Sequence, residues 1–359
     1  MTKGFTRLFT VLLLACCAVG AYALEKDADG AYIISNGADL KEFGNIVSGG
    51  EASANAKLSA DIDISDYKWT PIGDPYSGVF DGKNHTVKGL TITKNSNNFL
   101  GLFGTNSGTI KNVTVEEANI TVSTAFVTVR QGAIAGENKG SIINCHSVNS
   151  TMDNFSTGIA SKVGGLVGVN SGTIDGCSNI GGQCIVRSLS EVVGGIAGSN
   201  SGTIKNCENT AKVENSYSAL SATNHTGGIC GAADNGTVEN CFNGGEVTGK
   251  SGNVGAIAGT TNSKTEVEDC AWDKTKTNAP GLGNGAGQES NVYGYTTEEI
   301  ERGAIEKDST GTIVVNHFVN KYDYCCAYGT PEKVYGTEDI FNYENHSEIV
   351  TTGGIPATC

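Results

Sequence analysis

The apolar positions of this chain recur with a period near 30 residues. Short apolar cores that end in a glycine occupy six segments: 100–104, 132–136, 165–168, 195–198, 228–231 and 255–259. Their closing glycines are 32, 32, 30, 33 and 28 residues apart. Such a period is typical of a stacked array, in which no single unit can bury its apolar face alone. We interpret the recurring glycines as turn residues.

After each core, further positions of the repeat carry the same type of residue in successive copies, and we call each such set of equivalent positions a column. The first is a polar turn of asparagine and glycine, residues that tolerate left-handed backbone: Asn106-Ser107-Gly108, Asn138-Lys139-Gly140, Asn170-Ser171-Gly172, Asn200-Ser201-Gly202 and Asn235-Gly236. A strand then opens on an aliphatic column of Ile110, Ile142, Ile174, Ile204, Val238 and Val267. Three residues later lies a column of Val113, Cys145, Cys177, Cys207, Cys241 and Cys270. A third stretch, such as 113–122 or 211–213, completes most repeats.

The aliphatic and cysteine columns are an odd number of residues apart. On one straight strand they would therefore face opposite sides of the sheet. Both columns are apolar and both are expected inside, so the pattern predicts a corner between them. The position before the cysteine column suits a corner, being occupied by Asn112, Asn144, Gly176, Asn206, Asn240 and Asp269.

A strand, a turn, a strand, a bend and a third strand within about 30 residues form one coil of a parallel β-helix. The sequence therefore predicts an all-β fold, a right-handed parallel β-helix with a small C-terminal module. Coils stack at roughly 4.8 Å, so six coils would extend about 29 Å. Chain length alone would allow two or three domains, but the repeat favours one elongated domain.

The ends of the array carry different patterns. Leu40, Phe43 and Val47 have helical spacing, which predicts a short amphipathic helix over 38–47 that caps the open end of the β-helix. The alternation of Leu58, Ile62 and Ile64 predicts a first strand, with its aspartates in solvent. The predicted segments are a signal peptide (1–23), an N-terminal strand and capping helix (24–56), the β-helix (57–275), a linker (276–295) and a C-terminal module (296–359).

Within the C-terminal module, the pattern at 296–301 predicts a helix start, and 312–319 predicts a strand. Cys325 and Cys326 form a vicinal pair for which a free thiol, an intermolecular bond and a ligand role all stay open. The ending 356–359 is similar to the opening of a small cysteine-rich repeat of bacterial surface proteins. Two readings stay open for this ending: a truncated module or a chance match.

The N-terminus has the pattern of a secretory signal. Lys3 and Arg7 precede a short apolar run, and Ala21-Tyr22-Ala23 supplies a small-x-small cleavage site. A lipoprotein signal with a lipidated Cys16 is the alternative, so the predicted location is secreted or cell-surface.

No later segment is apolar and long enough to span a membrane. Removal of the signal changes the net charge from −14 to −16, since 22 basic and 38 acidic residues remain. This charge disfavours nucleic acid and anionic lipid as partners.

The cysteine column has two interpretations. Exported proteins often form disulfides, and stacked neighbours would lie near the lower end of the disulfide range. A buried cysteine also behaves as a small apolar residue. Because Val113 fills the same column in the first copy, we predict that Cys145, Cys177, Cys207, Cys241 and Cys270 pack as free, structural thiols.

The repeat resembles the GLUG-motif family, whose core is Gly-Leu-x-Gly. Gly165-Leu166-Val167-Gly168 matches that core literally, and the other copies carry isoleucine or alanine. The upstream segments 32–35, 69–73 and 78–87 are similar to the leader that precedes such repeats in bacterial surface proteins. The likeness covers roughly residues 31–275. It implies an exported, adhesin-like protein, since relatives include surface proteins and the non-catalytic parts of immunoglobulin A peptidases.

Motifs that could carry chemistry are weak. The segment 244–251 matches the phosphate-loop pattern, but a repeat strand follows it where that motif needs a helix. No His-Glu-x-x-His or Gly-x-Ser-x-Gly motif occurs, and the five histidines lack metal-ligand spacing. We therefore predict no catalytic residue, no metal site and no cofactor. His85 is expected to have a turn-packing role.

The sequence favours a non-enzymatic surface protein whose β-helix acts as a stalk or as a binding surface for glycan or protein. Exposed aromatic residues at Tyr67, Trp69 and Tyr76 would favour glycan binding. The alternatives are a carbohydrate-active β-helix enzyme, a non-catalytic accessory region of a truncated secreted peptidase, and a spacer without a ligand. Clustered carboxylates on adjacent coils would favour the enzyme. The oligomeric state is not predicted.

Overall fold

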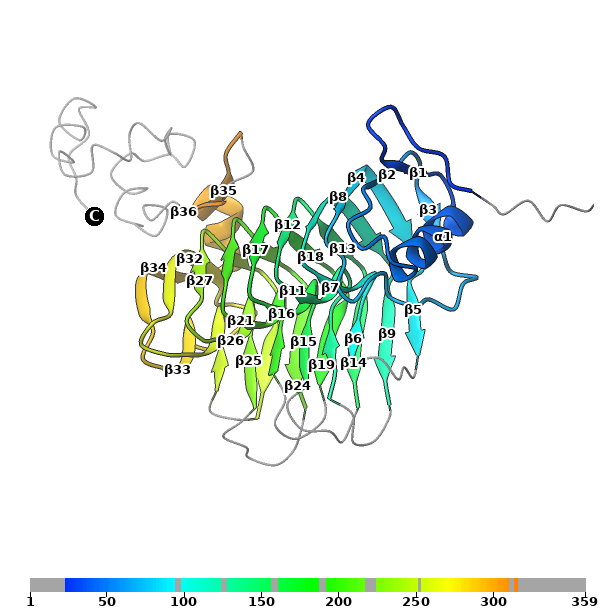
Figure 1. Ribbon diagram of the computed structural model, residues 1–359. Coiled ribbons are helices and arrows are strands. Elements are labelled where there is room, and N and C mark those ends of the chain that lie inside the picture. Colours follow the sequence, from blue (N-terminus) through cyan, green and yellow to red (C-terminus); the bar gives the residue numbers. More distant parts are fainter. Residues whose placement is uncertain are drawn as a thin grey trace, which may run out of the picture.

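The protein is a parallel β-helix, which confirms the predicted fold class (Figure 1). The structure is a computed structural model that describes residues 23–93, 98–123, 128–155, 161–186, 192–216, 224–250, 253–309 and 313–315. The predicted signal peptide up to residue 22, Cys16, Cys325, Cys326 and Cys359 lie outside these residues. One coil runs from β15 through β16, β17 and β18 to β19, over residues 162–186.

Four sheets are formed by equivalent strands of successive coils, and every pair within them is parallel. The fifteen-stranded sheet contains β1 (Tyr32–Ile34), β2 (Ala56–Leu58), β3 (Ile62–Asp63), β4 (Val79–Lys88), β8 (Thr109–Glu116), β12 (Ser141–Ile143), β13 (His146–Val148), β17 (Thr173–Asp175), β18 (Ser178–Ile180), β22 (Thr203–Lys205), β23 (Glu208–Asn209), β27 (Thr237–Glu239), β28 (Phe242–Asn243), β32 (Glu266–Asp273) and β34 (Gln288–Tyr295).

The other three sheets contain one strand from each coil. The β5 sheet consists of β5 (Thr91–Thr93), β9 (Asn119–Val122), β14 (Thr151–Asn154), β19 (Gln183–Val186), β24 (Lys212–Asn215) and β29 (Val247–Gly249). The β6 sheet consists of β6 (Phe99–Leu100), β10 (Arg130–Gln131), β15 (Lys162–Gly164), β20 (Val192–Gly194), β25 (His225–Gly227) and β30 (Val254–Gly255). The seven-stranded sheet consists of β7 (Phe103–Asn106), β11 (Ala135–Asn138), β16 (Val167–Asn170), β21 (Ala197–Asn200), β26 (Cys230–Ala233), β31 (Ala258–Thr261) and β33 (Leu282–Gly285).

The predicted corner lies inside the fifteen-stranded sheet, between strands such as β17 and β18. The corner residues Asn112, Asn144, Gly176, Asn206, Asn240 and Asp269 all have φ between 49° and 63°. This left-handed residue turns the chain, so Ile174 and Cys177 both point inward and are at most 1% exposed. The odd spacing of the two columns is therefore explained by the bend.

The cysteine column is buried and its five thiols are free. Each thiol donates to the carbonyl oxygen two residues earlier, as Cys145 Sγ does to Ile143 O at 3.3 Å and Cys207 Sγ to Lys205 O at 3.1 Å. Burial raises the pKa of the Cys145 and Cys207 thiols. These contacts give the column a packing role, with the sulfur atoms also satisfied as weak donors.

The asparagine turns differ from the prediction. Asn235 has a left-handed backbone, with φ of 63°. Asn106, Asn138, Asn170 and Asn200 instead end strands of the seven-stranded sheet with their side chains buried, and none of them has positive φ. The Nδ2 of each of the first three donates to the Oδ1 of the asparagine on the next coil, at distances of 2.8, 2.7 and 2.8 Å. Asn200 Nδ2 donates instead to the carbonyl of Thr237 at 3.1 Å. These four residues form an amide ladder inside the coil, and the expectation of left-handed turn residues is wrong for them.

The N-terminal end of the β-helix is covered by α1 (Gly37–Ser48), one residue longer at each end than predicted (Figure 1). Asn36 caps the helix by accepting hydrogen bonds from the amides of Ala38 and Asp39. The Phe43 ring lies 6.0 Å from Tyr76 and 6.1 Å from Phe80, centroid to centroid. The apolar face of the helix therefore closes the open end of the core, as terminal units do in repeat proteins.

The predicted linker at 276–295 is wrong. Strands β33 and β34 pair in parallel with β31 and β32 and add another coil. Leu282 is in register with Ala258, so Gly283 repeats the closing glycine Gly259 after only 24 residues. A shortened period and a glycine-rich sequence concealed this coil.

The C-terminal module starts at the predicted position. Its described residues form α2 (Thr297–Glu299), the π-helical turn η1 (Ile300–Ala304) and an antiparallel pair of β35 (Ile305–Lys307) and β36 (Ile313–Val315). A capping box joins Thr296 and Glu299. A small cluster of Phe242, Ala271, Tyr295, Ala304 and Ile313 attaches the module to the β-helix. Within the residues that the structure describes, no helix combines the length and apolarity of a membrane span.

Candidate functional site

The aromatic residues predicted to contact a ligand occupy three different environments. Tyr76 is fully buried and donates its hydroxyl to Ala54 O at 2.9 Å, so it belongs to the core. Trp69 is only 5% exposed, and its Nε1 donates to Leu102 O at 3.2 Å. Tyr67 is half-buried. The expected exposed aromatic face is therefore wrong for Tyr76 and Trp69, because the leader uses these rings to fill the capped end.

Trp69 nevertheless forms part of a surface depression, which we call the notch. It lies between one face of α1 and the segment that follows Tyr67, and it is partly open to solvent. Its lining residues are Lys41, Gly44, Asn45, Ser48, Lys68, Trp69, Thr70 and Pro71. The four helix residues have the i, i+3, i+4, i+7 spacing of one helical face.

The walls of the notch are fixed by the core. The buried face of α1 holds the helix, and the Trp69 indole hydrogen bond holds the opposite wall to the first coil. A Cβ atom at Gly44 would lie 3.5 Å from Ile72 Cγ1, an ordinary contact distance, so the helix approaches the segment closely at this glycine. Pro71 is buried and forms the floor with Trp69. The notch is therefore preformed.

The notch is positively charged in an acidic protein. Most lysines of the described part form ion pairs, such as Lys57 with Asp27 at 2.7 Å and Lys139 with Glu137 at 3.1 Å. Among the described residues, neither Lys41 nor Lys68 has a carboxylate within ion-pair distance, and both are exposed. The lining contains no carboxylate, cysteine or histidine. Its ammonium, amide and hydroxyl groups can therefore bind a ligand.

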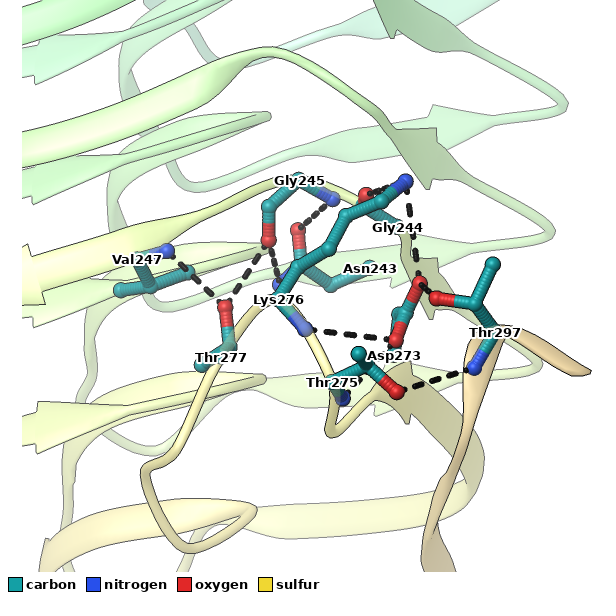
Figure 2. Close-up of polar contacts among 9 residues, drawn as sticks. All are labelled: Asn243, Gly244, Gly245, Val247, Asp273, Thr275, Lys276, Thr277 and Thr297. Carbon is teal, nitrogen blue, oxygen red and sulfur yellow. Dashed lines mark hydrogen bonds and ion pairs between the residues drawn. The ribbon is translucent and has the colours of Figure 1, made fainter.

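The phosphate-loop-like segment has a structural role (Figure 2). Its Gly244 and Gly245 carbonyls accept hydrogen bonds from Lys276 Nζ at 3.0 Å and Thr277 Oγ1 at 2.9 Å, and the Gly245 amide donates to Asn243 Oδ1 at 3.3 Å. A phosphate loop needs free amides that point at the anion. Here the segment contains strand β29, and Val254–Gly255 follows as strand β30, so it is part of the wall of the β-helix.

Asp273 organises the same region (Figure 2). It is 2% exposed, and its carboxylate accepts from Thr297 Oγ1 at 2.7 Å and from the Thr275 amide at 2.9 Å, with Lys276 Nζ at 3.6 Å. These contacts connect the last coils to the start of the C-terminal module. Since every partner belongs to the chain itself, the cluster holds two segments together.

A serine and a histidine meet on adjacent coils. His146 Nδ1 lies 2.8 Å from Ser178 Oγ, and its Nε2 lies 3.2 Å from Asn144 Oδ1. This spacing is within reach of a nucleophile and its base. Ser178 is only 5% exposed, however, and burial lowers the pKa of His146. His146 is partly exposed, but the hydroxyl that it contacts is buried in the wall of the β-helix.

Two further groups of titratable side chains lie outside the notch. His85 belongs to strand β4, and its Nδ1 lies 3.1 Å from Asp61 Oδ1. Glu239 and Glu268 stack on adjacent coils, but they lie on the outer face of the fifteen-stranded sheet and outside the notch. Within the described ranges, no three histidine, cysteine, aspartate or glutamate side chains are placed to hold a metal ion.

Asp81 is expected to make stability depend on acid pH. Burial opposes its ionisation, but hydrogen bonds from Asn112 and Lys83 and the charge of Lys111 lower its pKa to about 2. The unfolded value is higher, so its contribution is complete above about pH 4 and is lost as the pH falls toward 2. Denaturant unfolding of the wild type between these pH values should show an extra loss of about 1–2 kcal/mol relative to Asp81→Asn. Parallel pH profiles would contradict this.

Known proteins share parts of this chain. No protein-family model matches it, so the likeness to the GLUG-motif family stays a prediction. Over 128 residues it is 32% identical to halomucin of Haloquadratum walsbyi, which covers 33% of this chain and 1% of halomucin. Over 131 residues it is 30% identical to a "Putative Gly-rich membrane protein" of Evansella cellulosilytica, which covers 33% of this chain and 15% of that protein. The chain thus spans a small part of both relatives.

A solved structure shares the fold. The crystal structure of a putative immunoglobulin A1 protease from Bacteroides ovatus aligns with a TM-score of 0.54, over 81% of this chain and 93% of that one. The two sequences are 20% identical. At this identity the likeness concerns the β-helix itself.

Proposed function

We propose that this protein is a non-enzymatic, exported surface protein whose β-helix presents a binding surface for glycan or protein. The observation that carries the proposal is that the repeated residues have structural roles, whereas the notch is built from residues outside the repeats. The recurring residues fill the core, the corners and the close contacts between sheets, whereas the preformed notch at the capped end has unpaired cations and no carboxylate. The relatives support a surface role, since one is a halomucin and another is described as a membrane protein.

An array of glycans and host proteins, probed with residues 24–359, tests the proposal. We expect reproducible binding to a restricted set of ligands, because a single small cationic site discriminates by shape and charge. The thermally unfolded protein is the control and should give no such set. Complete silence of the folded protein would contradict a binding role and would favour a spacer.

The enzyme alternative is tested with the same material. Release of reducing ends or of unsaturated products from the polysaccharides on the array would contradict the non-enzymatic proposal. We expect none, because the notch holds no carboxylate to act as acid, base or nucleophile.

A further inference from the structure

The chemistry of the notch restricts its ligand. Lys41 on the helix and Lys68 on the opposite wall are both exposed and have no described carboxylate partner. The Lys41 ammonium lies 6.0 Å from the centre of the Tyr67 ring, which keeps it beside the notch. Glu42, which follows Lys41 on the helix, accepts from Asn45 Nδ2 at 2.9 Å through its Oε2. Two unpaired cations on facing walls favour an anionic ligand.

The remaining lining favours a polar ring over a peptide or a lipid chain. Trp69 and Pro71 give a small apolar floor, and Asn45, Ser48 and Thr70 put amide and hydroxyl groups at the rim. A sugar ring has apolar C–H faces and a rim of hydroxyls, which matches this arrangement. The lining is short, with four residues on the helix and four on the facing segment, which suits one ring better than an extended chain.

The helix also sets the orientation of the ligand. Ser48 is the last residue of α1, where carbonyl groups and the negative end of the helix dipole are exposed. An anionic group is disfavoured there, whereas Lys41 is seven residues earlier, in the first half of the helix. The negative group therefore belongs at the lysine end and the hydroxyls at the Ser48 end.

We infer that the notch binds an acidic saccharide, a sugar ring that carries a carboxylate, with the carboxylate between Lys41 and Lys68. This inference rests on the proposed function, because it names the ligand class of that binding surface. The carboxylate can come from a sialic acid or from a uronic acid, and both contain the same combination of ring, hydroxyls and charge.

Matched ligands separate charge from ring shape. Binding of residues 24–359 is measured by titration calorimetry with sialyllactose against lactose, and with trigalacturonate against its methyl ester. We expect at least one acidic member to bind at least tenfold tighter than its neutral partner. The affinity should also fall as salt rises, because the two lysines are exposed. Equal binding within both pairs would overturn the inference.

Matched variants locate the site. Lys41→Gln combined with Lys68→Gln should weaken binding of the acidic saccharide at least tenfold with an unchanged unfolding midpoint. Lys250→Gln combined with Lys264→Gln removes the same charge from exposed lysines outside the notch and should change affinity less than twofold. An equal loss in both double variants would show a general charge effect and would overturn the inference.

Tryptophan emission gives a second readout of the position. The chain has two tryptophans, and Trp272 Nε1 has no hydrogen-bond partner, so Trp272→Phe removes no hydrogen bond and leaves Trp69 as the single fluorophore. The acidic saccharide should change its emission, and the neutral partner should not. If the protein binds glycans on the array but the notch variants bind them normally, the inference fails and the proposed function stands. If it binds nothing, both fail.

Discussion

Gly168→Ala should destabilise the protein by about 3–5 kcal/mol, or prevent folding. Gly168 lies within strand β16, with no positive φ, and is the closing glycine of the literal Gly-Leu-x-Gly copy. A Cβ atom there would lie 2.4 Å from the Gln131 amide nitrogen, 2.7 Å from the Arg130 carbonyl carbon and 2.7 Å from Gly136 O. All three are backbone atoms held by strand pairing, so the neighbours cannot move aside cheaply. Denaturant unfolding gives the measurement.

Gly44→Ala is the matched control for Gly168→Ala. Gly44 lies inside α1, and the nearest atom to its added Cβ is Ile72 Cγ1 at 3.5 Å. Alanine is favoured over glycine in a helix, so this variant should be equally stable or about 0.5–1 kcal/mol more stable. If Gly168→Ala stays within about 0.5 kcal/mol of the wild type, the sheets do not approach as closely as the structure has them.

The role of the closing glycine differs from the turn that the sequence suggested. After the first copy, the closing glycines bring the seven-stranded sheet against a strand of the β6 sheet, as Gly136 does at Phe99 and Gly198 at Lys162 and Val163. A glycine can be needed for a turn, or because a neighbouring strand passes too close for a side chain. The sequence of a repeat shows a glycine in both cases. Only the three-dimensional arrangement of the two sheets separates the two uses.

The repeat period predicted the inward-facing columns and the corner between them. The columns of Ile174 and Cys177 and the corner at Gly176 follow from spacing and from the need to bury both columns. The coil that contains Gly283 was missed because its period is short. The amide ladder was missed because a polar residue beside a glycine also suits a turn, and nothing in one repeat shows that the side chain points inward.

The candidate site was only partly predictable. The sequence singled out Trp69 as an exposed aromatic ring. In the structure this ring is nearly buried and forms the floor of the notch. The notch joins residues 41–48 to residues 68–71, two non-repeating segments of the leader. Their contact depends on how α1 caps the first coil, so no spacing rule brings Lys41 and Lys68 together. The hydrophobic pattern of α1 predicted the helix and its buried face, and the opposite wall came only from the fold.

Asn170→Ala should destabilise the protein by about 2–4 kcal/mol. Asn170 is fully buried and donates to Asn200 Oδ1 at 2.8 Å and to the carbonyls of Gly172 and Thr203 at 3.2 Å each. Its Oδ1 accepts from Asn138 Nδ2 at 2.7 Å. Alanine leaves these buried groups short of partners and opens a cavity between two coils. Denaturant unfolding, followed by near-ultraviolet circular dichroism, measures the loss in the free energy of unfolding.

Two companion variants show whether the cost comes from the buried ladder. Asn144→Gly removes the exposed contacts of the corner, where Asn144 Nδ2 donates to Asn112 Oδ1 at 3.0 Å and Asn144 Oδ1 lies 3.2 Å from His146 Nε2. It keeps the left-handed backbone, as Gly176 does. This variant should lower the free energy of unfolding by at most about 0.5 kcal/mol, because the exposed groups that lose a partner are hydrated by water.

Asn170→Asp places a carboxylate against the acceptor oxygens of the ladder, which raises its folded pKa above the unfolded value. Its stability should therefore rise as pH falls from 7 toward 4, opposite to the effect of Asp81. Equal losses in Asn170→Ala and Asn144→Gly, or a pH-independent Asn170→Asp, would show that the ladder does not hold the coils together.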